Sequence, residues 1–142
     1  MGQSLAGNAT PGNFVTDSVI SNVTIAASAS SPNSATYTNG GAAGAEIDGW
    51  ELSIAVGYGA TISGGPANVA ICRQVDNTPD FESSAYAWAF QHVASPTAST
   101  VVTITKTIAA NGAFQVVISN PSGNSSLTGV TIRARPIQKA IG

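Results

Sequence analysis

The sequence is almost without charge. Only 8% of its 142 residues are Asp, Glu, Lys or Arg, and no Lys or Arg precedes Arg73. A soluble globular domain typically has about a quarter of its residues charged. Nucleic-acid binding needs clustered cations that displace counterions from phosphates, and the 5 Lys and Arg residues of the chain cannot supply such a patch. We therefore expect no nucleic-acid partner, and a surface better suited to packing against other protein than to isolation in water.

Cysteine and histidine occur once each, as Cys72 and His92. A lone cysteine allows no internal disulfide, and zinc sites normally combine several His, Cys or carboxylate ligands. We expect no metal and no other cofactor, an inert Cys72, and a His92 that lies at a strand end or an interface. Serine is abundant, but no Gly-x-Ser-x-Gly nucleophile elbow is present. We therefore expect no catalytic residue and no enzymatic activity.

Long apolar runs are also missing. The longest fall far short of the ~20 residues that span a bilayer, and the first residues carry neither a basic region nor the apolar segment of a secretory signal. We expect no membrane association. If the chain is complete, we expect synthesis in a cytoplasm without export by the ordinary route, as for a protein that leaves its cell within a particle.

What the chain does have is strict alternation of apolar and polar residues, the pattern of a strand with one buried face. It is clearest over 50–58, where one face carries Trp50, Leu52, Ile54, Val56 and Tyr58. Nine segments are expected to be strands, at 14–20, 22–28, 34–38, 46–58, 67–75, 84–92, 99–108, 113–119 and 127–137. Polar turns such as Asn111-Gly112 separate them.

This spacing predicts an all-β fold, a single-domain antiparallel β-sandwich or jelly roll of about eight or nine strands. The domain is expected over 14–137, between a flexible N-terminal arm at 1–13 and a C-terminal tail at 138–142. No segment has the sustained periodicity of a helix.

Three alternating aromatic residues, Tyr86, Trp88 and Phe90, form the most informative local feature. Rings on one face of a strand either form the centre of a sandwich core or stack on sugars. We favour the core, with the small residues between them allowing close approach of a second layer. The alternative predicts glycan stacking by Trp50, Tyr58, Tyr86 and Trp88.

Charge is distributed unevenly along the chain. The N-terminal half carries only the acids Asp17, Glu46, Asp48 and Glu51, and no acid follows Glu82. Near the C-terminus, Arg133 and Arg135 share the outward face of the last strand, and Ile137 and Ile141 would be stranded in solvent unless docked. These four residues are the expected interface. The acidic segment 76–82 could hold calcium, but we favour a solvated turn.

In composition, unsignalled start, loose N-terminal arm and terminal stretch Val130–Pro136, the chain resembles small bacteriophage virion proteins. Such proteins include capsid decoration proteins and tail or fibre accessory domains. The resemblance carries over no functional residue. It implies a β-sandwich or jelly roll that is usually oligomeric and that binds and stabilises a shell or tail.

Two functions are therefore expected from the sequence. The first is a non-enzymatic structural protein of a virion, a capsid decoration or cement protein made in the host cytoplasm. Its partners would be its own copies, for example in a trimer, and a larger assembly such as a major capsid protein. The alternative is a carbohydrate-binding or adhesin module, including a tail or fibre domain.

Overall fold

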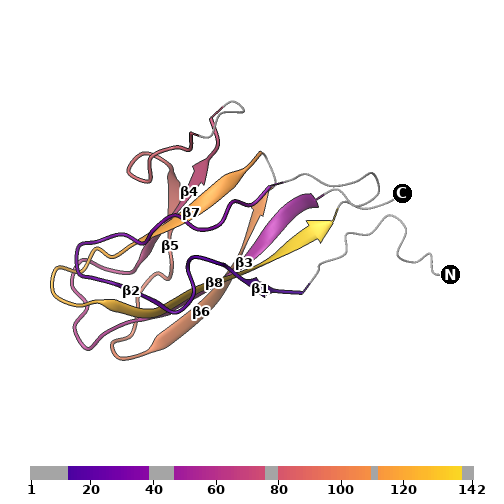
Figure 1. The fold of residues 1–142 in the computed structure, drawn as a ribbon. Coiled ribbons are helices and arrows are strands. Elements are labelled where there is room, and N and C mark those ends of the chain that lie inside the picture. Colours follow the sequence, from indigo (N-terminus) through magenta and orange to yellow (C-terminus); the bar gives the residue numbers. More distant parts are fainter. Residues whose placement is uncertain (1–12, 39–46, 76–79, 110–111, 139–142) are drawn as a thin grey trace.

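The computed structural model describes residues 13–38, 47–75, 80–109 and 112–138 (Figure 1). These residues form eight strands in two antiparallel sheets, and no helix occurs among them. The all-β, sandwich-type fold expected from the alternation is thus confirmed. Most of the expected N-terminal arm and C-terminal tail, including Ile141, lies outside the described residues. No segment in the described part of the chain is a helix of the length and hydropathy needed to cross a bilayer.

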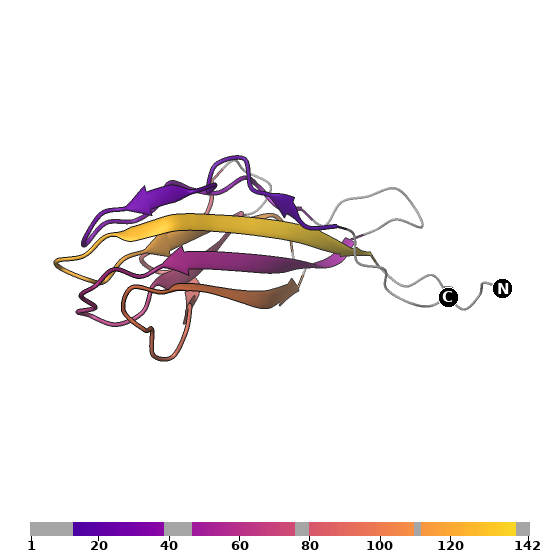
Figure 2. The ribbon, with the colours of Figure 1, turned by 90° about the horizontal axis from the view of Figure 1, so that it is seen from below.

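The first sheet is built on β8 (Leu127–Gln138) and β3 (Ile47–Gly57), which pair along most of their lengths. β6 (Val101–Ala109) continues the sheet beyond β3, while β1 (Val15–Thr16) and β2 (Val23–Ile25) share the other side of β8. Figure 2 shows this sheet nearly face on, with β8 in yellow between the indigo strands and β3, and with β6 outermost.

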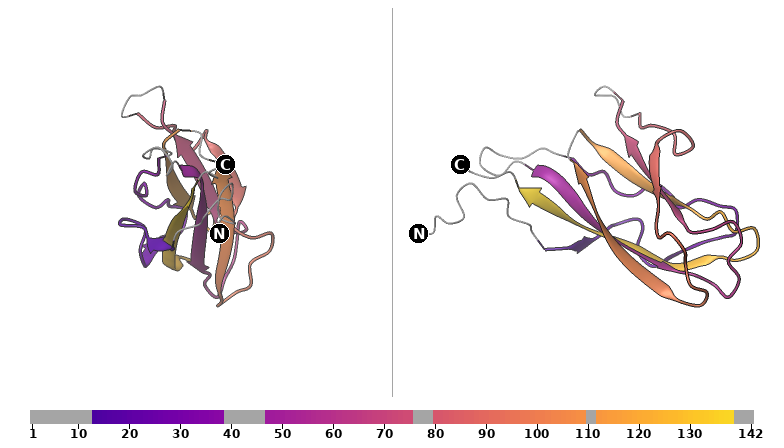
Figure 3. Two further views of the ribbon diagram at one scale, coloured as in Figure 1. Left: turned by 90° about the vertical axis from the view of Figure 1, so that its right-hand side faces the viewer. Right: turned by 180° about the vertical axis from the view of Figure 1, so that it is seen from behind.

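The second sheet contains β5 (Trp88–Gln91), β4 (Asn68–Arg73) and β7 (Phe114–Ser119), in that order. It lies over the first sheet, as Figure 1 and both views of Figure 3 show. The core fills the space between the two sheets. Most of its fully buried side chains come from alternate positions of four strands: Leu52, Ile54, Val56, Val69, Ile71, Phe114, Val116, Ile118, Val130 and Ile132.

The prediction of a strand at 34–38 is wrong, because serine side chains replace part of the backbone hydrogen bonding to β7. The extended segment 30–37 runs beside β7, but its only bridges to β7 are at Ser30 and Tyr37. Between them, the hydroxyl of Ser31 accepts the N–H of Ile118 at 2.9 Å, and the hydroxyl of Ser34 accepts the N–H of Val116 at 2.8 Å. Side chains of this kind compete with backbone pairing, so a regular strand does not form.

The N-terminal strands are also shorter than expected. The segment 14–20 contributes only β1, because the carboxylate of Asp17 binds the N–H groups of Val19 and Ile20 and turns the chain. The segment 22–28 contributes only β2. Asn22, with a φ angle of 52°, precedes the strand, and a turn follows it, in which the N–H of Ala29 donates to the carbonyl of Ala26 and Ser28 has a φ angle of 58°.

Candidate functional site

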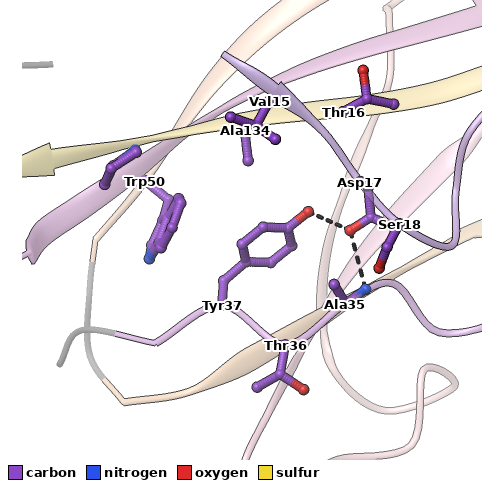
Figure 4. Close-up of a pocket in the computed structure, with 10 residues that line it drawn as sticks. Val15, Thr16, Asp17, Ser18, Ala35, Thr36, Tyr37, Trp50 and Ala134 are labelled. Carbon is purple, nitrogen blue, oxygen red and sulfur yellow. Dashed lines mark hydrogen bonds between the residues drawn. The ribbon is translucent and has the colours of Figure 1, made fainter. Parts of the chain in front are cut away.

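Asp17 is the centre of a buried polar cluster between the first sheet and the segment beside β7. One carboxylate oxygen accepts the hydroxyl of Tyr37 and the N–H of Ala35, the latter at 3.0 Å (Figure 4). The other accepts the N–H groups of Val19 at 2.9 Å and Ile20 at 2.7 Å. Asp17 is only 4% exposed. Four donors therefore satisfy both oxygens of a buried carboxylate, as burial of a charge requires.

The pKa values of Asp17 and Tyr37, at the centre of this cluster, are both shifted. Burial alone would raise the pKa of Asp17, but the four hydrogen bonds together lower it below its ordinary value. Burial, followed by the bond and the charge of Asp17, raises the pKa of Tyr37 far above its usual range. Asp17 is thus held ionised and Tyr37 neutral, so neither group is poised to exchange a proton near neutral pH.

A cavity of about 340 Å³ lies beside this cluster. Figure 4 shows the rings of Tyr37 and Trp50 on one side of it and Val15 and Ala134 on another. The two rings meet edge to face, with centroids 5.1 Å apart, and the indole N–H of Trp50 donates to the carbonyl of Thr38 at 2.9 Å. The lining of the cavity is thus mainly apolar, and the carboxylate of Asp17 beside it has no free acceptor position.

His92 occupies a second buried polar site, in the core. Its Nε2 lies 2.9 Å from the carbonyl of Ile54, and its Nδ1 lies 2.9 Å from the hydroxyl of Tyr58. We assign the proton to Nε2, because the Ile54 carbonyl can only accept; Nδ1 then accepts from Tyr58. The same hydroxyl accepts the N–H of Ala67 at 3.1 Å.

This chain of bonds makes His92 a core residue rather than a ligand. Burial lowers the pKa of His92, and the bond to Ile54 offsets this only in part. His92 immediately follows the last residue of β5 and is 2% exposed, so it is a strand-end residue but is not placed at an exposed interface. Among the described residues, no group of three or more His, Cys, Asp or Glu side chains could hold a metal ion.

Cys72 is a free thiol on the outer face of the second sheet. It is nevertheless 1% exposed, because it packs in a small apolar cluster with Ala70 and Val117 against which Phe81 and Ala87 lie. Burial, followed by the charge of Glu82, raises the pKa of the thiol. Both effects disfavour the reactive thiolate.

The three alternating aromatic residues, Tyr86 in the turn before β5 and Trp88 and Phe90 in β5, do not form the centre of the core, so that interpretation is wrong. Tyr86 is 91% exposed and Trp88 54% exposed, while Phe90 packs partly against the core. Trp88 and Phe90 do point inward, because they pair with Ile71 and Val69 of β4. β5 is the edge strand of its sheet, however, so the space beyond its inner face is open to solvent.

The structure separates the four residues expected to stack on a glycan. Tyr58 is 5% exposed and its hydroxyl is bonded, so it has no free ring face. Trp50 is half-buried beside Tyr37. Tyr86 and Trp88 alone of the four present largely exposed rings, and Trp88 lies against Phe90 with centroids 5.5 Å apart.

Three of the four expected interface residues lie on β8, and Ile141 lies outside the described residues. Arg133 is exposed, whereas Arg135 pairs with Glu51 of the neighbouring strand, with a nitrogen–oxygen distance of 2.5 Å, and lies over the ring of Phe14. Ile137 is half-buried and pairs with Gly49. The acid that Arg135 meets is therefore one of its own chain.

The acidic segment is only partly described, since residues 76–79 lie outside the described residues. At its end, the carboxylate of Glu82 accepts the N–H of Arg73 at 2.9 Å, and the N–H of Glu82 donates to the carbonyl of Arg73. Glu82 thus acts as a backbone clamp on the end of β4. This use of one oxygen agrees better with a structural turn than with a calcium ligand.

The Asp17–Tyr37 pair was not anticipated from the sequence, because its members are 20 residues apart. One local signal was available. An Asp at the end of an alternating run often binds backbone N–H groups two or three residues on and ends the strand.

Comparisons with family models, curated proteins and solved structures found no match to this chain.

Proposed function

We propose that this protein is a non-enzymatic structural component of a virus particle, a capsid decoration protein that stabilises the shell by oligomeric packing. It would be made in the host cytoplasm and carried in the virion. Its partners would be other copies of itself and a larger assembly such as a major capsid protein, with no nucleic acid and no membrane.

The observation that carries this proposal is the outer face of the first sheet. Across β6, β3 and β8 this face presents mostly small neutral side chains, among them Thr103, Thr105, Thr107, Ser53, Ala55 and Thr131. Glu51 and Arg135 on this face neutralise each other, and Arg133, which pairs with Ser53, is the one other charged residue of this face among the described residues. A broad sheet surface with little charge to desolvate can be covered by another subunit at small electrostatic cost.

The polar groups of the interior support the absence of catalysis. The carboxylate of Asp17 is saturated by four donors, and the ring of His92 is bonded at both nitrogens in the core. Lys106 lies over the ring of Phe90, 4.9 Å from its centroid. These groups act as structural elements, because a general acid or base must reach a substrate.

The decisive experiment is mass spectrometry of purified virus particles from the source of the sequence, together with light scattering of the purified protein. We expect the protein in the particle fraction in stoichiometric amounts, and self-association in solution. A strictly monomeric protein that is absent from particles would overturn the proposal.

The exposed rings of Tyr86 and Trp88 favour a second candidate, a carbohydrate-binding or adhesin module such as a tail or fibre domain. Aromatic rings with one apolar face free can stack on the apolar face of a sugar. Screening against a glycan array, followed by titration of the best glycan against tryptophan emission, tests this candidate. Binding that persists in Trp88→Ala and Tyr86→Ala would exclude these rings as the site.

A further inference from the structure

β6 is the long unpaired edge of the first sheet. It pairs with β3 through nine consecutive residue pairs, from Gly49 with Ala109 to Gly57 with Val101, and the register contains no bulge. It ends the strand order of its sheet. In the described part of the chain, no other residue forms a backbone hydrogen bond with β6.

One hydrogen bond next to this ladder shows which backbone groups of β6 face the open edge. The N–H of Tyr58 donates to the carbonyl of Thr100, immediately beyond the pair of Gly57 with Val101. Bonded and non-bonded pairs alternate in an antiparallel ladder. Even-numbered residues of β6 therefore bond to β3, and odd-numbered residues direct their N–H and C=O groups outward.

Those outward-facing residues carry none of the usual protection of an edge strand. All five are exposed and neutral: Val101, Thr103, Thr105, Thr107 and Ala109. Natural edges are commonly blocked by Lys, Pro, a bulge or an inward-pointing charge. Lys106, the one charge on β6, lies on the inner face of the strand, because it pairs with the buried Leu52. It is an inward-pointing charge, but it is half-buried and held over Phe90 of its own molecule, so it does not block the outward-facing groups.

The other edges offer much less. β5 has four residues, and the chain before it turns back through bonds from the N–H groups of Tyr86 and Ala87 to the carbonyl of Ser83. β1 and β2 have two and three residues. Segment 30–37 covers β7. Among the described residues, β6 is therefore the edge best able to add a strand.

We propose that a second copy of this chain adds its own β6 to this edge, antiparallel and centred on Thr105. The inference rests on the self-association in the proposed function and names the surface that would produce it. A two-fold axis through Thr105 is the one that overlaps all nine residues of both strands. It places Thr105 against Thr105 and Thr103 against Thr107, pairs that stabilise neighbouring strands.

Charge selects the same arrangement. In this register Lys106 of one copy lies opposite Ile104 of the other, so the two ammonium groups are not directly paired. Centring the axis on Lys106 would set them against each other, which is destabilising. This pairing of two β6 strands also places the second copy near Trp88 and Phe90. Lys106 of β6 lies over Phe90, and Phe90 lies against Trp88.

Cysteine cross-linking tests both the edge and the register. In a Cys72→Ser background, Thr105→Cys should form a disulfide-linked dimer, since directly opposed residues have Cα separations within disulfide range. Thr103→Cys and Thr107→Cys should cross-link poorly alone and efficiently when mixed. Efficient linkage of Thr103→Cys alone, with none for Thr105→Cys, would contradict this register.

A charge at the axis tests whether the joint holds the copies together. Thr105→Lys sets two like charges against each other and should weaken dimerisation by about tenfold or more. Thr24→Lys, at an exposed position of β2, is the matched control. It should leave the mass of the dimer, measured by light scattering, at the wild-type value. Circular dichroism and thermal melting would show that each variant is folded, with Thr105→Glu as the replacement if Thr105→Lys is not.

The outcomes separate this inference from the proposed function. If the wild type self-associates but neither Thr105→Cys nor Thr105→Lys has its expected effect, the edge proposal is wrong and another surface is used. A strict trimer in light scattering would also overturn it, because a two-fold joint pairs the copies. If the wild type is monomeric and no pair cross-links, both this inference and the proposed self-association fail.

Discussion

The hydroxyl of Tyr37 donates a hydrogen bond to the carboxylate of Asp17, across one lateral side of the sandwich. Asp17 follows β1 in the first sheet, and Tyr37 bridges to Phe114 of the second. The same carboxylate also takes the N–H of Ala35. One buried acid thus joins the two layers, at the side opposite to the open edge of β6.

Replacing Asp17 should destabilise the fold about as much as truncating a buried core side chain. Asp17→Asn keeps the shape but places an amide NH₂ among N–H donors, and we expect a loss of about 2–4 kcal/mol in the free energy of unfolding. Urea denaturation of both proteins measures it. Tyr37→Phe, which removes one donor, should cost about 1–2 kcal/mol, and equal losses in the two variants would contradict the role of Asp17 as the centre.

Stability should decline as the pH falls below neutrality, because of His92. Its pKa is lowered in the folded state, so the unfolded chain binds a proton first. The contribution is therefore complete above the ordinary histidine pKa near 6.5 and is lost as pH falls through the lower folded value. Denaturation series between about pH 7 and pH 5 should show this slope, and His92→Gln should flatten it. An unchanged slope in the variant would assign it to other groups.

The two tryptophans should differ in their access to solvent. Trp88 is 54% exposed, whereas Trp50 is half-buried against Tyr37 with its N–H bonded. Acrylamide should quench Trp50→Phe, in which only Trp88 emits, more strongly than Trp88→Phe. The measurement is made on dilute protein, where self-association is least. Equal quenching in the two variants would contradict the exposed position of Trp88.

Substitution by alanine should reduce the stability of the fold more at Gly64 than at Gly65. Both have positive φ angles, of 84° and 92°. A Cβ at Gly64 would lie 2.4 Å from the carbonyl oxygen of Pro121, whereas one at Gly65 would meet nothing within 4 Å. Gly64→Ala should cost about 2–3 kcal/mol and Gly65→Ala about 1 kcal/mol, since only the first adds a clash to the backbone strain. Thermal unfolding of the pair provides the comparison.

The central strands of the fold could be predicted because one physical rule governs them. Leu52, Ile54 and Val56 alternate with more polar or smaller residues, and burial of one face of a sheet requires that pattern. The expected strand at 46–58 matches β3 at 47–57, and that at 127–137 matches β8 at 127–138. Periodicity identified these strands without knowledge of their neighbours.

Periodicity failed where the neighbours decide the outcome. Tyr86, Trp88 and Phe90 alternate as core residues do, but Tyr86 lies in the turn before β5, and the exposure of Trp88 depends on β5 being an edge strand, which is a property of the strand order. Ser31 and Ser34 appear as ordinary polar positions, yet their hydroxyls stand in for backbone partners of β7. The partnership of Asp17 and Tyr37 depends on how the two sheets are stacked.

The serine-lined segment beside β7 also bears on how far assembly through β6 could proceed. Its serine hydroxyls already accept N–H groups of β7 along that edge of the second sheet. At the edge of the first sheet opposite to β6, the short β1 and β2 offer few backbone groups for a further strand. Once two copies join through β6, the described residues hold no comparable margin for a third strand-to-strand contact. Growth by sheet extension would therefore terminate at a closed pair instead of continuing into a fibre.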